Sequence, residues 1–140
     1  MAIILKAENI RKKFYQPTEF EVLKGVGFEV NEGEFFSIIG KSGCGKSTLL
    51  YILSTMDTDY EGTLNIKGEQ LTGKKQNALS AFRNEHLGFV FQFHFLLPEF
   101  SALKNVMLPA LKLGKYSEEA IEHRAMAKLR LVDMQDYAIN

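Results

Sequence analysis

The sequence predicts an α/β fold in which a mixed sheet precedes a set of helices, and three observations support this prediction. Residues 40–48 read GKSGCGKST, a complete G-x-x-x-x-G-K-[ST] pattern. Apolar runs at residues 35–39 and 49–53 flank the pattern, which fits a strand leading into a loop and a helix leading out of it. After about residue 95 the apolar residues recur at helical spacing, so the chain changes character there.

The part of the chain before the glycine-rich loop is predicted to be rich in strands. We expect strands at residues 3–6, 19–23 and 25–30, followed by a turn at residues 31–34. Residues 35–39, FFSII, combine β-branched and aromatic side chains with almost no polar residue, which predicts a fully buried parallel strand.

The segment behind the loop is predicted to alternate between helix and strand. A helix is expected to begin near Gly45, and residues 77–85 are expected to form another helix. Residues 62–66 alternate between polar and apolar, which is typical of an exposed edge strand. Residues 87–91, LGFVF, predict a second buried strand that ends at the polar Gln92.

Two further helices are predicted near the end of the sequence, each with a serine that can cap it. Ser101 precedes a helix that Pro109 is expected to bend or end, and Ser117 precedes a second helix. Apolar faces at helical spacing support both helices: Leu103, Val106 and Met107 in the first, and Ile121, Ala125, Leu129 and Val132 in the second.

Composition limits the class of protein. With 140 residues, 46% of them hydrophobic, the chain fits one soluble domain with a core. The 17 basic and 17 acidic residues balance, which argues against a nucleic-acid partner, and the basic run at residues 11–13 is expected to be solvated surface. The single cysteine, Cys44, excludes an internal disulfide and fits a reducing compartment, so a cytoplasmic location is expected.

The chemistry of the glycine-rich loop points to a nucleoside triphosphate with Mg²⁺. Gly40, Gly43 and Gly45 lack Cβ atoms, so successive backbone amides can turn inward and surround an anion. The helix that begins there adds the positive end of its dipole. Lys46 can reach the terminal phosphates and the Ser47 hydroxyl can ligate Mg²⁺. The alternative is an ordinary glycine-rich turn between a strand and a helix.

Segments on both sides of the loop resemble the ATP-binding subunits of ABC transporters. Residues 8–14, ENIRKKF, are similar to the family's N-terminal strand, and residues 22–30 and 32–35 to its next two strands. Residues 87–92, LGFVFQ, match the segment that ends in the family's Q-loop glutamine. Within the family, residues 92–106 look most like the lipoprotein-releasing subfamily.

The resemblance implies ATP and Mg²⁺ as cofactors, and it adds two residues to the site. Phe14 stands where the family has the aromatic that stacks on adenine, with Tyr15 as the alternative. Gln92 would contact Mg²⁺ and the attacking water, and Lys46 would stabilise phosphate charge during catalysis. The expected ATP contacts are Phe14, Gly40, Ser42, Gly43, Cys44, Gly45, Lys46, Ser47 and Thr48, and the expected Mg²⁺ ligands are Ser47 and Gln92.

The resemblance also implies partners and a location. It implies a head-to-tail dimer with a second ATPase subunit, and transmembrane permease subunits that dock near the segment from Phe93 to Phe100. The protein would lie on the cytoplasmic face of the inner membrane and couple ATP hydrolysis to export or lipoprotein release. Residues 1–95 would form a partial ATP-binding core and residues 96–140 the start of a helical subdomain.

The family pattern has a second half that this sequence does not contain. The L-S-G-G-Q signature, the Asp-Glu Walker B strand and the switch histidine do not occur in the 140 residues. We therefore expect the chain to correspond to the N-terminal portion of an ABC ATPase and to be inactive alone. Two alternatives stay open: a truncated module that binds nucleotide weakly or not at all, and a non-transport ABC ATPase that acts on DNA or ribosomes.

Overall fold

The computed structural model describes residues 2–140, which divide into two compact units, with the boundary in the sequence between Arg83 and Asn84. No helix within this part of the chain is long and apolar enough to cross a membrane. The elements in chain order are β1 (Ile3–Phe14), β2 (Phe20–Asn31), α1 (Lys46–Leu53), β3 (Glu61–Ile66), β4 (Glu69–Gln70), α2 (Gln76–His86), α3 (Ala102–Leu113), α4 (Glu118–Leu131) and the 3₁₀ turn η1 (Gln135–Tyr137).

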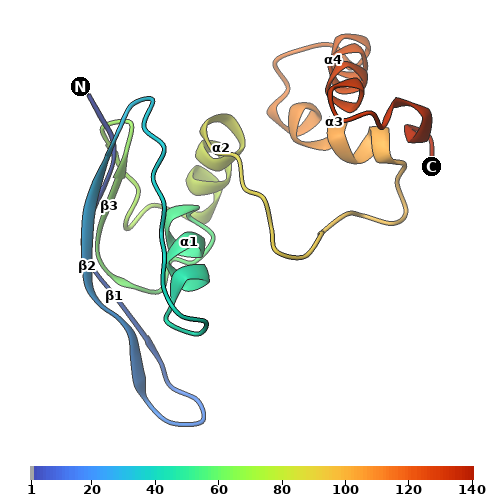
Figure 1. Cartoon of the computed structure of the whole chain (residues 1–140). Helices are drawn as coiled ribbons and strands as arrows, with labels where there is room; N and C mark the ends of the chain where they lie inside the picture. Colours follow the sequence, from blue (N-terminus) through green and yellow to red (C-terminus); the bar gives the residue numbers. More distant parts are fainter. Residues whose placement is uncertain (1) are drawn as a thin grey trace. The chain divides into compact units, whose positions relative to one another are not determined.

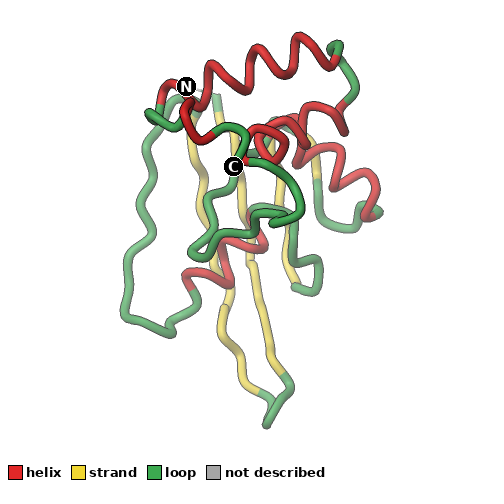
Figure 2. Tube along the Cα trace, turned by 90° about the vertical axis from the view of Figure 1, so that its right-hand side faces the viewer, coloured by secondary structure: helices red, strands yellow, loops and turns green. Residues whose placement is uncertain are grey.

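A four-stranded antiparallel sheet in the order β2-β1-β3-β4 organises the first unit (Figure 2). The strands predicted at the N-terminus are present but longer, because β1 and β2 form one hairpin of two 12-residue strands. The prediction that residues 62–66 form an edge strand is wrong. β3 pairs with β1 on one side and with β4 on the other, so Leu64 and Ile66 are buried inside the sheet.

The two buried parallel strands predicted at residues 35–39 and 87–91 are absent. Both segments are irregular, and among the described residues neither has a neighbouring strand to pair with. Their side chains are correspondingly open: Phe35 is 94%, Ile39 90% and Val90 97% exposed. An extended apolar segment needs a partner strand and covering side chains before it becomes part of a sheet. Both segments are apolar, but within residues 2–140 they have no neighbouring strand and no covering side chains that would make them buried strands.

The core of the first unit lies between the sheet and α1, which runs along one face of the sheet (Figure 1). Ile10 of β1, Ile52 of α1 and Leu64 of β3 are completely buried. Lys12 is also buried, at 6% exposure, so the prediction that residues 11–13 are solvated surface is wrong at this position. Its ammonium is paired with acidic groups from the connector after α1, which removes the cost of burying an isolated charge.

The helices α3 and α4 pack against each other in the second unit, and both begin as predicted. Ser101 and Ser117 are the N-caps, and their hydroxyls accept hydrogen bonds from the amides of Lys104 and Ala120. Pro109 lies inside α3 but does not end it, because the helix continues to Leu113. The core contains Met107, Ile121 and Ala125, with Leu129 also buried. Val132, predicted on the same apolar face, follows the end of α4 and is 65% exposed.

Candidate nucleotide-binding site

The N-terminus of α1 differs from those of α3 and α4 in having no side-chain cap. Its N-cap is Gly45, whose backbone is left-handed with φ of 103°, and no acidic residue lies in the first turn. The first amides of a helix have no partner within the helix and carry the positive end of its dipole. At the start of α1 no side chain accepts a hydrogen bond from these amides as a cap, so they can bind an anion from outside the chain.

Two glycines of the loop lie very close to a neighbouring side chain, and one of them, Gly45, also has a left-handed backbone that favours glycine. A Cβ on Gly45 would lie 2.7 Å from Val22 Cγ1 of β2, which is closer than atoms in contact can be. A Cβ on Gly40 would lie 2.6 Å from Cys44 Sγ. The loop is therefore folded tightly on itself at Gly40 and against the sheet at Gly45, and the left-handed backbone of Gly45 is a conformation that glycine adopts without strain.

Lys46, the first residue of α1, folds its side chain back over the loop. Its Nζ donates to the backbone oxygens of Gly40 and Lys41, both at 2.7 Å, and lies 3.6 Å from Cys44 Sγ. The two carbonyls fix the ammonium above the loop. A thiol is a weak acceptor, so the third donor is the one that a phosphate oxygen can take over most easily.

The remaining loop residues offer the groups that a phosphate with Mg²⁺ requires. Ser42, Gly43 and Ser47 are exposed, and Thr48 is half-buried. Cys44 is a free, exposed thiol. The loop thus combines backbone amides, one fixed ammonium and accessible hydroxyls, with no carboxylate in the first turn of α1 to repel an anion. This donor set fits a polyphosphate with a bound magnesium ion.

Phe14 is the last residue of β1 and lies in the same unit as the loop. Its ring packs against Phe20, with centroids 5.7 Å apart, and the Lys12 ammonium lies 5.3 Å from its centroid. The ring is 38% exposed, so part of its surface stays available to a planar base. Tyr15 is 64% exposed.

Gln92 belongs to the second unit, where it is exposed in an irregular segment. The strand that was expected to carry it to the site is not formed. The structure therefore brings together the loop residues from Gly40 to Thr48, and it places Gln92 in the other compact unit.

The segment predicted to dock a membrane partner presents apolar side chains to solvent. Phe93, Phe95 and Leu96 are 71%, 65% and 63% exposed. Asn105 of α3, which the sequence did not single out, holds the end of this segment. Its Oδ1 accepts from the amide of Leu97 at 2.9 Å, and its Nδ2 donates to the oxygen of Leu97 at 3.0 Å. A polar side chain near a helix start that is preceded by an apolar segment is a weak sequence signal, so only the fold reveals this role.

Known proteins with similar sequences are ATP-binding subunits. The profile described as ABC transporter matches residues 23–140. The lipoprotein-releasing system ATP-binding protein LolD of Aquifex aeolicus (strain VF5) is 52% identical over 122 residues, which are 87% of this chain and 53% of that protein. LolD of Bacteroides thetaiotaomicron is 50% identical over 135 residues, which are 96% of this chain and 60% of that protein.

Solved structures give the same assignment. The dimeric structure of a post-hydrolysis state of the ATP-binding cassette MJ0796, bound to ADP and Pi, superposes with a TM-score of 0.91 and 33% sequence identity. The match covers 98% of this chain and 61% of that one. The chain thus spans between half and two thirds of the length of these relatives. On this evidence the chain belongs to the ABC transporter family, as part of an ATP-binding cassette of the lipoprotein-releasing subfamily.

Proposed function

We propose that the loop from Gly40 to Thr48 binds the phosphates of Mg·ATP, and that the chain supplies this site to an ABC ATPase that drives lipoprotein release. The observation that carries the proposal is that α1 begins, without a side-chain cap, directly after a loop with the complete phosphate-loop sequence. The Lys46 ammonium is held at the same loop by the backbone oxygens of Gly40 and Lys41. Family membership supports ATP as the nucleotide.

Each residue has a distinct part in the proposed site. The amides of the loop and of the first turn of α1 hold the phosphates, and Lys46 balances their charge in the ground state and in the transition state. Ser47 is the protein ligand of Mg²⁺, with Gln92 as a second contact to the metal and to water. Bound Mg²⁺ would neutralise the charge that develops on the phosphates during transfer. Phe14 stacks on the adenine ring.

The remaining roles belong to the full-length protein and its partners. Relatives are longer than this chain, and we propose that the further residues supply the Walker B carboxylates, the signature sequence and the switch histidine. Hydrolysis would take place in a head-to-tail dimer of two ATPase subunits, and the solved structures of the MJ0796 cassette are dimeric. A pair of permease subunits would dock on the exposed apolar residues between Phe93 and Phe100, at the cytoplasmic face of the inner membrane.

A calorimetric titration of the chain with Mg·ATP tests the binding proposal. Lys46→Ala removes a charged donor from the phosphates and is expected to weaken ATP binding by about 10- to 150-fold, since a hydrogen bond to a charged group contributes about 1.5–3 kcal/mol. Lys41→Ala is the matched control, because Lys41 contributes its backbone oxygen rather than its ammonium to the loop. Equal affinity of wild type and Lys46→Ala would contradict the proposal.

A second candidate function is a nucleotide-binding module without turnover, which describes the 140 residues taken alone. The chain contains the positioning groups Lys46 and Ser47 but no Asp-Glu pair after an apolar strand that could orient the attacking water. We expect the isolated chain to bind ATP without releasing phosphate steadily. Phosphate release that Lys46→Ala abolishes would contradict this expectation.

A further inference from the structure

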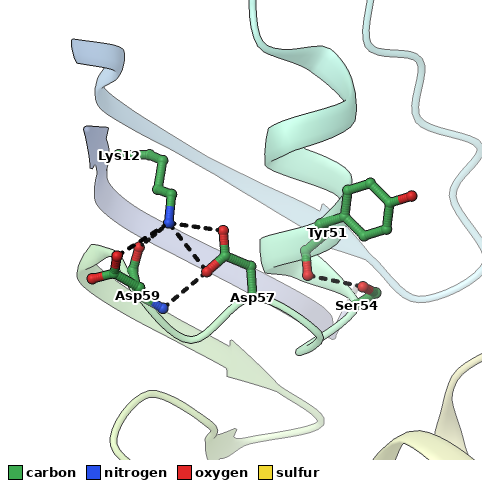
Figure 3. A network of polar contacts seen from close by, with 5 residues as sticks. All are labelled: Lys12, Tyr51, Ser54, Asp57 and Asp59. Carbon is green, nitrogen blue, oxygen red and sulfur yellow. Dashed lines mark hydrogen bonds and ion pairs between the residues drawn. The ribbon is translucent and has the colours of Figure 1, made fainter. Parts of the chain in front are cut away.

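Lys12 is a buried cation held by one short segment of the chain. Its side chain is 7% exposed, and its Nζ lies 3.0 Å from Asp57 Oδ2 and 2.6 Å from the backbone oxygen of Asp59 (Figure 3). The Asp59 carboxylate adds a longer contact at 3.5 Å. Buried lysines are uncommon unless paired, and this one uses the segment directly after α1 as its partner.

The acidic partners are themselves fixed to the C-terminal end of α1. The amide of Asp57 donates to the oxygen of Tyr51, and the Ser54 hydroxyl donates to the same oxygen at 2.9 Å. The amide of Asp59 donates to Asp57 Oδ1 at 2.9 Å. The acidic segment that pairs with Lys12 is therefore not a free loop. Through it, Lys12 connects β1 to the C-terminal end of α1 by a series of polar contacts.

The same ammonium also faces the ring that is proposed to receive the adenine. Lys12 and Phe14 are two residues apart on β1, so their side chains lie on one face of the strand. Nζ is 5.3 Å from the centroid of Phe14, within the range of a cation–π contact. The Lys12 ammonium thus contacts both the acidic segment after α1 and the ring of Phe14.

From this arrangement we propose that Lys12 is a positioning residue for base stacking. It fixes the Phe14 ring relative to α1, whose opposite end carries the phosphate loop, and so sets the spacing between the base and phosphate subsites. The inference rests on the proposed function. A lysine with a structural role alone would stabilise the fold without affecting how much the base contributes to binding.

The test compares the affinity for Mg·ATP with that for inorganic tripolyphosphate, both measured by calorimetry on the whole chain. The ratio of the two affinities isolates the contribution of the base. Lys12→Met keeps most of the apolar stem and removes the charge. It is expected to weaken ATP binding by about 2- to 30-fold, the range of cation–π contacts from exposed to desolvated sites, and to leave tripolyphosphate binding within about twofold. Lys13→Met is the matched control, because Lys13 is more exposed and pairs with Glu19.

A double variant shows whether Lys12 acts through Phe14. If it does, Lys12→Met in the background of Phe14→Ala leaves the affinity ratio unchanged. A further decrease of the ATP-to-tripolyphosphate affinity ratio in that background would overturn the inference. An unchanged ratio in the single variant Lys12→Met would overturn it as well. Should Lys12→Met not fold, as judged by circular dichroism, Asp57→Asn weakens the same contact. A lowered ratio in Asp57→Asn then supports the inference and an unchanged ratio overturns it.

Failure of the inference can be told from failure of the proposed function. A wild-type chain that binds neither ATP nor tripolyphosphate overturns both. A wild-type chain that binds both, with the same affinity ratio as Lys12→Met, overturns the positioning role alone.

Discussion

Phe14 ends β1 and Tyr15 follows it, and we expect only Phe14 to stack on adenine. Phe14→Ala removes an aromatic contact of about 0.5–1.5 kcal/mol, so ATP binding should weaken by about 2- to 12-fold. Binding of inorganic triphosphate, which has no base, should stay the same. Tyr15→Ala serves as the comparison, measured by the same titration. If Tyr15→Ala loses affinity for ATP while Phe14→Ala does not, the assignment of the stacking residue is wrong.

Ser47 is expected to act through the metal, which makes its effect depend on Mg²⁺. Ser47→Ala removes one hydroxyl ligand, and we expect ATP binding in the presence of Mg²⁺ to weaken on the order of tenfold. With the metal chelated, the variant and the wild type should bind ATP equally. Ser37→Ala, at an exposed serine outside the loop, provides the control. An equal loss with and without metal would show that Ser47 does not ligate Mg²⁺.

At the level of single elements, the start of α1 depends on a glycine that packs against the sheet. Gly45→Ala forces a side chain into the left-handed region and places its Cβ 2.7 Å from Val22 Cγ1. We expect a loss of about 2–4 kcal/mol, from backbone strain plus overpacking. Gly43 has φ of 80° but no atom within 4 Å of its Cβ position, so Gly43→Ala should cost only about 1 kcal/mol. Urea unfolding measures both, and equal losses would contradict this account of the loop.

The elements that could be predicted from the sequence are those with local signals. The caps at Ser101 and Ser117 and the turn into α1 depend on residues within a few positions of one another, and each was located correctly. The strands expected at residues 35–39 and 87–91 depend on pairing partners elsewhere in the chain, and they are not formed among residues 2–140.

The site shows the same division between local and distant information. The phosphate loop could be identified from nine consecutive residues. Lys12 could not, because Asp57 and Asp59, which bury and hold it, lie 45 and 47 residues further along the chain. Within the basic run at residues 11–13, nothing in the local pattern separates this lysine from its neighbours.

For the molecule as a whole, the exposed apolar segments predict association or low stability. Phe35, Ile39 and Val90 are almost fully exposed, although residues of these types are usually found in protein interiors. We expect the 140-residue chain either to form oligomers through these segments or to be only marginally stable. Light scattering tests the first outcome and thermal unfolding the second. A monodisperse monomer with a sharp transition at high temperature would contradict both.

The central claim is that the loop from Gly40 to Thr48 receives the phosphates of ATP, and the position of bound nucleotide tests it most directly. The measurement is a crystal structure of the chain grown or soaked with Mg·ATP or a non-hydrolysable analogue. The account predicts that the β- and γ-phosphates lie over the N-terminus of α1, with Lys46 Nζ and the loop amides as their hydrogen-bond donors. Triphosphate bound elsewhere on the chain, with the loop empty at saturating nucleotide, would contradict it.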